Sequence, residues 1–251
     1  VQENKTKKLI KNQFEHYLAP SIVKLLQKNP GKLQLGGDTR ELSILFSDLR
    51  DFTTLSEQFK SNPQELTDLI NKYLTPMTGC VIDNNGTVDK FIGDALMAFW
   101  NAPIDDEDHR VNTINCALEM FELLDKLNVE LKEKDIELRM GIGVNTGDVV
   151  VGNMGSNQRF DYTCLGDAVN LSARLESQTK GYKVGLLVGE QTKKGIEDKF
   201  NFIELDKIAV KGKTEGIKIF TIIDSHKYII EHTTFLEAYV NQRWDLAIEQ
   251  A

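Results

Sequence analysis

Short apolar runs alternate with polar stretches along this chain, and most of these runs have the length of β-strands. Residues 42–46 form one such run and predict a buried strand. Residues 87–100 predict two strands joined by a tight turn at Gly93 and Asp94, because glycine gives the backbone the freedom that a sharp turn needs. Further strands are predicted at residues 136–144, 148–151 and 184–188 and within residues 200–223.

Helical patterns separate these strands. The first predicted helix of this part runs from Pro63 to about Val81 with Asn62 as its N-cap, because proline suits the first helical position. Other helices are predicted at residues 107–132, 166–177 and 190–199. The alternation of strands and helices predicts a ferredoxin-like α/β sandwich, in which helices cover one side of a central sheet.

Composition narrows the class of protein. The chain has 251 residues, of which 41% are hydrophobic, and this is enough for one α/β domain with flanking segments. A net charge of -8 disfavours nucleic-acid binding, which needs a basic surface, although a nucleotide substrate remains compatible. Cys80, Cys116 and Cys164 lack metal-ligand spacing and predict reduced thiols in a cytoplasmic protein. The first residue is valine, so we expect a fragment of a longer protein, which leaves a membrane anchor elsewhere open.

Two predicted strand ends carry aspartates. Asp48 and Asp51 follow the strand at residues 42–46, and Asp94 occupies the hairpin turn. Carboxylates in such loops can hold hard divalent cations, since Mg²⁺ prefers carboxylate oxygens, water and substrate phosphates. The alternative is that they are ordinary turn or cap residues, with Lys90 and Asp94 forming a surface ion pair of small energetic value.

Four motifs then narrow the choice: FSDLRDFT, DKFIGDALMAFW, GIGVNTGDVVVGNMG and DYTCLGDAVNLSARLES. Their order and spacing resemble those of class III nucleotidyl cyclase catalytic domains over roughly residues 42–223, and most resemble the bacterial class IIIb adenylate cyclases. The resemblance implies an α+β sandwich with a central, mostly antiparallel sheet and flanking helices, an elaboration of the ferredoxin-like plan. It also implies a function: conversion of ATP to 3′,5′-cyclic AMP and pyrophosphate.

The resemblance implies a role for the aspartates at each of the two predicted strand ends. Asp48 and Asp94 match the aspartates that bridge two metal ions, Mg²⁺ or Mn²⁺, in each active site, and the backbone carbonyl of Leu49 lies nearby in the motif. One ion would activate the 3′-hydroxyl for in-line attack on the α-phosphorus, and the other would hold the phosphates. Asp51 matches a position that is often not acidic, so it is interpreted as a supporting residue or a helix cap.

Three further residues are implied to act on the substrate's sugar and phosphates. Asn170 and Arg174 lie four residues apart, on one face of a helix. By the resemblance, Asn170 orients the ribose and Arg174 neutralises the charge of the reacting phosphate. Lys211, in a Gly/Lys loop, matches the lysine that contacts the terminal phosphates.

The resemblance implies that two residues recognise the purine base of the substrate. Lys90 matches the lysine that donates to N1 of adenine, and Thr163 falls where many adenylyl cyclases have aspartate and others threonine or serine. A threonine hydroxyl can accept a hydrogen bond from the adenine amino group. Guanylyl cyclases typically have glutamate and cysteine at these two positions.

The family builds each active site between two chains. Asp48 and Asp94 would come from one chain, and Lys90, Thr163, Asn170 and Arg174 from the other, so a symmetric homodimer would contain two equivalent sites. Two alternatives stay open, namely a guanylate cyclase and a catalytically silent nucleotide-binding module that relays a signal. Silent relatives would be expected to lose a metal aspartate or the Asn/Arg pair, and this chain keeps them all.

The same resemblance predicts the domain organisation. Residues 38–224 are predicted to form the catalytic domain. Residues 1–37 have amphipathic helical spacing, interrupted at Pro20, and resemble the signalling linker that joins cyclase domains to an upstream sensor; a packing helix of the domain itself is the alternative. Residues 225–251 predict a helical extension, which is either a plain terminal helix or the start of a tetratricopeptide-like pair.

Overall fold

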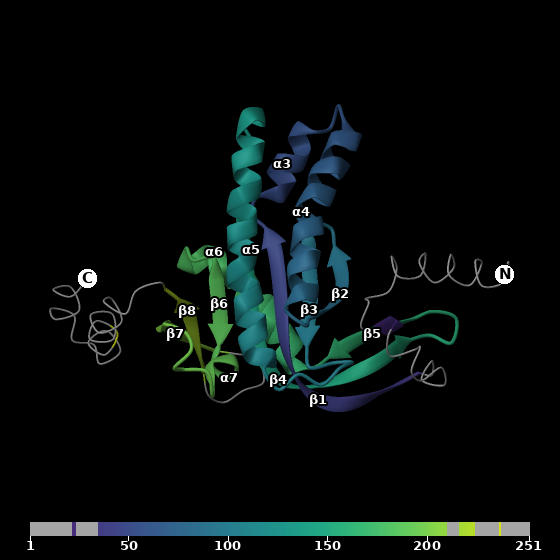
Figure 1. Cartoon of the computed structure of the whole chain (residues 1–251), viewed down its shortest axis with the longest axis vertical. Helices are drawn as coiled ribbons and strands as arrows, with labels where there is room; N and C mark the ends of the chain where they lie inside the picture. The colour runs from purple at the N-terminus through teal and green to yellow at the C-terminus, as the bar shows by residue number, and fades with distance from the viewer. Residues whose placement is uncertain (1–21, 24–34, 210–215, 224–235, 237–251) are drawn as a thin grey trace.

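The computed structural model describes residues 22–23, 35–209, 216–223 and 236 (Figure 1). Its strands are β1 (Gly36–Leu49), β2 (Thr87–Ile92), β3 (Ala95–Trp100), β4 (Met140–Gly155), β5 (Phe160–Leu165), β6 (Leu186–Gly189), β7 (Phe202–Ile208) and β8 (Ile217–Ile222). Its helices are α3 (Phe52–Gln58), α4 (Pro63–Asp83), α5 (His109–Leu131), the 3₁₀ helix η2 (Lys132–Lys134), α6 (Asp167–Tyr182) and α7 (Glu190–Lys193).

The strands form one sheet in the order β2-β3-β1-β4-β6-β8-β7, with β5 paired to the C-terminal part of β4. β4 and β6 run parallel, and the other strand pairs of the described residues are antiparallel. β1 pairs with β3 on one side and along its whole length with β4 on the other, from Gly36 opposite Asn153 to Leu49 opposite Met140. The predicted mostly antiparallel sheet with flanking helices is therefore confirmed.

The boundaries predicted around β4 are wrong. Residues 136–144 and 148–151 were expected to be two strands, whereas a single strand covers residues 140–155. Thr146 and Gly147 interrupt the apolar alternation, but they pair with Ser43 and Leu42 of β1, so the ladder continues through them. A long partner strand has here outweighed a local break in the pattern.

Other predicted ends shift by a few residues. β1 continues to Leu49, so Asp48 lies inside the strand rather than just past it. α4 begins at Pro63 as predicted, and the Asn62 side chain accepts a hydrogen bond from the backbone N–H of Glu65. The helices predicted at residues 107–132, 166–177 and 190–199 are observed as α5, α6 and α7, and α7 is much the shortest of them.

Helices cover both faces of the sheet, so the prediction that they cover only one side is wrong. α4 and α5 pack together on one face (Figure 1). Their apolar side chains share a core with those of Leu45 and Ile142. α6 packs on the other face, where the hydroxyl of Ser172 lies 2.9 Å from the carbonyl oxygen of Gly143. Gly143 permits this close approach, because a Cβ there would lie 2.2 Å from the backbone nitrogen of Glu176.

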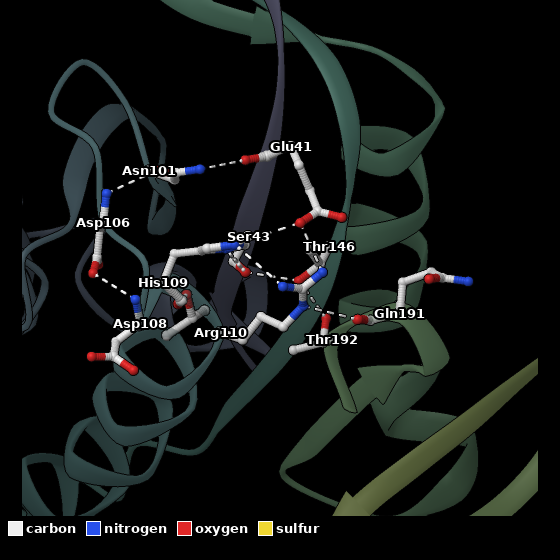
Figure 2. A network of polar contacts seen from close by, with 11 residues as sticks. Glu41, Ser43, Asn101, Asp106, Asp108, His109, Arg110, Thr146, Gln191 and Thr192 are labelled. Carbon is white, nitrogen blue, oxygen red and sulfur yellow. Dashed lines mark hydrogen bonds and ion pairs between the residues drawn. The ribbon is translucent and has the colours of Figure 1, made fainter. Parts of the chain in front are cut away.

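A buried polar network joins β1, β4, α5 and α7 (Figure 2). The hydroxyl of Ser43 lies 2.8 Å from Nδ1 of His109 and 2.7 Å from Oγ1 of Thr146. Thr146 Oγ1 lies in turn 3.0 Å from Oγ1 of Thr192. The three hydroxyls therefore form a continuous chain of hydrogen bonds that ends on the imidazole.

Charged side chains close the rim of this network. Arg110 Nη2 donates to Glu41 Oε1 at 2.8 Å, and Arg110 Nε donates to the carbonyl of Gln191. Glu41 Oε1 also lies 3.7 Å from Nε2 of His109. Burial, and then the charge of Arg110, lower the pKa of His109, so the imidazole is mostly neutral at pH 7.

Three predictions fall largely or wholly outside the described residues: the N-terminal linker, the C-terminal helical extension and Lys211. The three cysteines lie within the described residues. They are free thiols, as predicted, and all three are buried. No helix in the described part of the chain combines the length and the apolar character that crossing a membrane would need.

Candidate active site

Two carboxylates meet at the C-terminal end of β1. β1 pairs with β3, and Ser47 lies opposite Leu96, so the β2–β3 turn that carries Asp94 lies beside the end of β1. Oδ2 of Asp94 accepts a hydrogen bond from the backbone N–H of Leu49 at 3.3 Å. Strand pairing alone therefore brings Asp94 beside Asp48 and Leu49, from which it is far removed in the sequence.

The electrostatics of this acidic pair are unfavourable without a cation. The pKa of Asp48 is raised to about 7, first by burial, then by its hydrogen bond to Asp94 and the negative charges of Asp94 and Glu176. Burial also raises the pKa of Glu176, which projects from α6. Carboxylates that are half-buried and close to each other repel, and a divalent cation between them would reverse that repulsion.

The donor set fits a magnesium-type ion that is completed by substrate. Within the described residues, no three His, Cys, Asp or Glu side chains converge so as to hold a metal ion by themselves. Mg²⁺ is usually bound by one or two carboxylates together with water and substrate phosphates, so a pair of aspartates is sufficient. Asp48 and Asp94 are therefore suited to a metal ion that arrives with a nucleotide.

Asp51 lies at a helix cap position, which is one of the two predicted alternatives, but its side chain does not act as a cap. It occupies the N-cap position of α3 with a left-handed backbone, φ 55°, but its side chain makes no capping hydrogen bond. Its carboxylate instead pairs with Lys180 at 2.9 Å and with Arg139 at 3.5 Å. The hydrogen bond and charge of Lys180 hold the pKa of Asp51 below its usual value. Asp51 thus links α6 and the residue just before β4 to the segment that follows β1.

Asn170 and Arg174 lie together on the exposed side of α6. The opposite side of this helix buries Leu171 and Leu175 against the sheet. The side chains of Asn170 and Arg174 form no hydrogen bond or ion pair with the residues that the structure describes. Both side chains are therefore free to contact a substrate.

Lys90 and Thr163 meet at a residue that the sequence analysis did not single out. The side chain of Asp89 is fully buried, its Oδ2 accepts a hydrogen bond from Thr163 Oγ1 at 2.5 Å, and its Oδ1 lies 3.4 Å from Lys90 Nζ. Within the described residues, the ion-pair partner of Lys90 is thus Asp89, so the alternative of a Lys90–Asp94 surface pair is wrong.

A β-bulge explains why neighbours in β2 converge. The pairing of β2 with β3 shifts between Val88 and Lys90, which leaves Asp89 as the extra residue. A bulge interrupts the strict alternation of side chains and can redirect one of them. The signal in the sequence would have been an acidic residue beside the lysine in an otherwise apolar strand, but a bulge cannot be predicted from that alone.

These side chains fall into two groups within one chain. One contains Asp48 and Asp94 with Glu176 nearby, and the other contains Lys90, Asp89 and Thr163. No hydrogen bond or ion pair connects the two groups in the part of the chain described here.

Comparison with known proteins gives a consistent result. Residues 37–224 match the family described as Adenylate and Guanylate cyclase catalytic domain. Adenylate cyclase 1 of Rhizobium meliloti (strain 1021) is 32% identical over 185 residues, which cover 73% of this chain and 28% of that protein. The crystal structure of the adenylyl cyclase CyaB from P. aeruginosa has a TM-score of 0.70 and 34% identity, covering 77% of this chain and 98% of that chain.

A guanylyl cyclase is nearly as similar. The crystal structure of the guanylyl cyclase Cya2 has a TM-score of 0.68 and 33% identity, covering 77% of this chain and 98% of that chain. Overall similarity therefore does not show whether the substrate base is adenine or guanine. The chain also spans less than half the length of the curated adenylate cyclases it matches. Because the family match covers most of the sequence, this chain belongs to the adenylate and guanylate cyclase catalytic domain family, that of the class III nucleotidyl cyclases.

Proposed function

We propose that this chain is the catalytic domain of an adenylate cyclase, which converts ATP to 3′,5′-cyclic AMP and pyrophosphate. The observation that carries the choice of base is the convergence of Lys90 and Thr163 on one buried carboxylate, because together they offer a donor and an acceptor to a purine edge. The adenylate cyclases among its relatives support the same choice.

Class III cyclases generally depend on metal ions, and the acidic pair fits this requirement. Asp48 and Asp94, with the carbonyl of Leu49, would hold two Mg²⁺ or Mn²⁺ ions per active site. When bound, the ions would lower the pKa of the 3′-hydroxyl and neutralise charge on the triphosphate. The raised pKa of Asp48 supports the assignment, because two crowded carboxylates favour a site that is filled by cations.

The residues of α6 would complete the chemistry. The guanidinium of Arg174 suits a charge that is spread over several phosphate oxygens, and Asn170 on the same face would orient the ribose. Their exposure and lack of partners in the described structure support this role. Lys211 would contact the terminal phosphates.

We propose further that the active form is a homodimer with two equivalent sites. Each site would take Asp48 and Asp94 from one chain, and Lys90, Thr163, Asn170 and Arg174 from the other. The absence of a direct contact between the acidic pair and the base-reading group, among described residues, is consistent with this division. The greater length of the curated relatives supports an upstream sensor domain in the full-length protein.

The direct test is to incubate the purified chain with ATP or GTP and with Mg²⁺ or Mn²⁺, and to identify the product. We expect the chain to form cyclic AMP from ATP faster than it forms cyclic GMP from GTP, and to do so only when metal is present. Preferential formation of cyclic GMP would favour the guanylate cyclase alternative, to which the similarity with Cya2 gives some weight. Nucleotide binding without any cyclic product would favour the silent relay module.

A further inference from the structure

We infer that Asp89 is a positioning residue that sets base specificity, because its carboxylate accepts the hydrogen bond of the Thr163 hydroxyl and holds the ammonium group of Lys90. The inference rests on the proposed function, since it concerns how the same site distinguishes adenine from guanine. It adds a residue that acts on the base only through its two neighbours.

The first step concerns the direction of one hydrogen bond. An ionised carboxylate has no proton to donate, so in the 2.5 Å contact the hydroxyl of Thr163 must be the donor to Asp89 Oδ2. A threonine hydroxyl has a single proton. Once that proton is committed to Asp89, Thr163 can only accept a hydrogen bond from a base.

The second step concerns Lys90. Its ammonium group lies 3.4 Å from Asp89 Oδ1, and the side chain is 42% exposed, so it remains accessible to a ligand. An ammonium group carries three donors and no acceptor. Asp89 therefore holds a group that can only donate beside a group that can only accept.

This polarity matches adenine. N1 of adenine is an acceptor and its 6-amino group is a donor, so both would be satisfied by Lys90 and Thr163. Guanine has the opposite pattern, with a proton on N1 and an acceptor at O6. Guanine would place its N1 proton against the Lys90 ammonium and its O6 against a lone pair of Thr163. Both of these guanine groups would then lack a hydrogen-bond partner.

The burial of Asp89 makes this arrangement rigid. Its side chain is fully buried, and a bulge in β2 turns it away from regular alternation. Burial raises the pKa of Asp89, while the Thr163 hydroxyl and the charge of Lys90 oppose that rise. A buried carboxylate requires partners. Here Oδ2 has the hydrogen bond of Thr163, whereas Oδ1 has no hydrogen bond among the described residues and relies on the charge of Lys90.

The test compares ATP with GTP in the purified chain and in the Asp89→Asn variant. An amide has both a donor and an acceptor, so Thr163 is no longer forced to donate to residue 89. We expect the ratio of kcat/KM for ATP to that for GTP to fall about tenfold or more, as one mispaired hydrogen bond allows. An unchanged ratio in a folded Asp89→Asn variant would overturn the inference.

The matched control is Asp206→Asn. Asp206 on β7 accepts a hydrogen bond from the hydroxyl of Tyr182, also at 2.5 Å, so this variant removes the same kind of contact elsewhere. The ratio should stay at its original value. An equal fall in both variants would show a general structural effect and would also overturn the inference.

A cycle with Thr163→Val tests whether Asp89 acts through Thr163. In the Thr163→Val background, Asp89→Asn should change the ratio by much less than it does in the original chain. Full additivity of the two changes would contradict an action through the hydroxyl. If Asp89→Asn does not fold, Asp89→Ser replaces it, because serine is smaller, neutral and able to donate or accept.

A measurement on the unchanged chain needs no variant at all. Inosine triphosphate has the N1 proton and O6 of guanine but lacks its 2-amino group. The chain should reject it as strongly as it rejects GTP; ready use of inosine triphosphate would place the discrimination at the 2-amino group and overturn the inference. If the unchanged chain forms no cyclic AMP from ATP, the proposed function itself fails, which is a distinct result.

Discussion

Two parts of β1 carry polar clusters that differ in how well their members are paired. Around Ser43, in the middle of the strand, three hydroxyls and the imidazole of His109 are linked by hydrogen bonds, and Glu41 at the rim is paired with Arg110 (Figure 2). At the C-terminal end, Asp48 lies against Asp94 with the charge of Glu176 nearby, and its pKa is raised to about 7.

The difference separates a structural cluster from a binding site. Ser43, His109 and Glu41 are the residue types of a hydrolase triad, but Ser43 is completely buried and its hydroxyl is engaged by neighbours. A satisfied buried network stabilises the fold and has nothing left to offer a ligand. The acidic pair is the reverse, since its members raise each other's energy until a cation arrives.

The largest effect is expected from Asp94→Asn. This change should lower cyclase activity by about a thousandfold or more, because several kcal/mol of charge stabilisation in the transition state depend on the metal site. Thermal unfolding should occur at the same temperature or higher without metal, since the change removes a repulsion. Turnover close to that of the original chain would remove Asp94 from the metal site.

The second prediction concerns the origin of the two half-sites. Asp48→Ala and Arg174→Ala should each be nearly inactive as homodimers. In a mixed dimer one site receives both defects, while the other receives an intact acidic pair from the Arg174→Ala chain and an intact Arg174 from its partner. With random mixing about half of the dimers are mixed, so activity should recover to about a quarter of the original.

Exchange of the chains has to be shown for this result to count. Native mass spectrometry of the mixture measures the fraction of mixed dimers directly. Mixed dimers without recovered activity would mean that each site is built within one chain. Lys90 and Asp94 of one chain would then have to act in the same active site.

The third prediction concerns the network around Ser43. Ser43→Ala removes the partner of His109 Nδ1 and one of the two partners of Thr146 Oγ1, and should lower the free energy of unfolding by about 2 kcal/mol. For a domain of this size the unfolding midpoint should fall by about 5 °C. The kcat of the folded protein should change little. A large loss of kcat without loss of stability would show that the network around Ser43 takes part in the chemistry.

How far the sequence could predict the molecule depends on the range of the interactions. Asn62 and Pro63 start α4 as predicted, because capping is local. The acidic pair was also predictable, since Asp48 and Asp94 stand beside apolar runs and in recognisable motifs. By contrast, the continuation of β4 through Thr146 depends on its pairing with β1, which the local pattern does not contain.

Asp89 shows the same limit within the site. Its neighbour Lys90 was identified from the motif, but the contact with Thr163 joins β2 to β5 and requires a bulge. Glu176 was missed for a related reason, because its effect on Asp48 arises only when α6 packs against the sheet. Residues whose role depends on tertiary contacts could not be found from spacing.

The smallest expected effect is a dependence of stability on pH and metal. The pKa of Asp48 is raised from 3.8 to about 7, so the fold favours the protonated form of this carboxyl. As pH rises through this interval, Asp48 ionises more readily in the unfolded chain than in the folded one, and the free energy of unfolding falls without metal. Solvent screening of this half-exposed group keeps the change in the unfolding midpoint to about a degree or two.

Divalent cations should reverse this trend. Mg²⁺ binds the ionised pair, so it should raise the unfolding midpoint more at pH 8 than at pH 5, where protons compete for the carboxylates. Differential scanning calorimetry at the two pH values, with and without Mg²⁺, measures the effect. In the Asp94→Asn chain most of this pH-dependent gain should disappear, whereas Ser43→Ala should retain it. An equal Mg²⁺ effect at both pH values would mean that the crowded pair is not where the ion binds, and the contrast between the middle and the C-terminal end of β1 would lose its electrostatic basis.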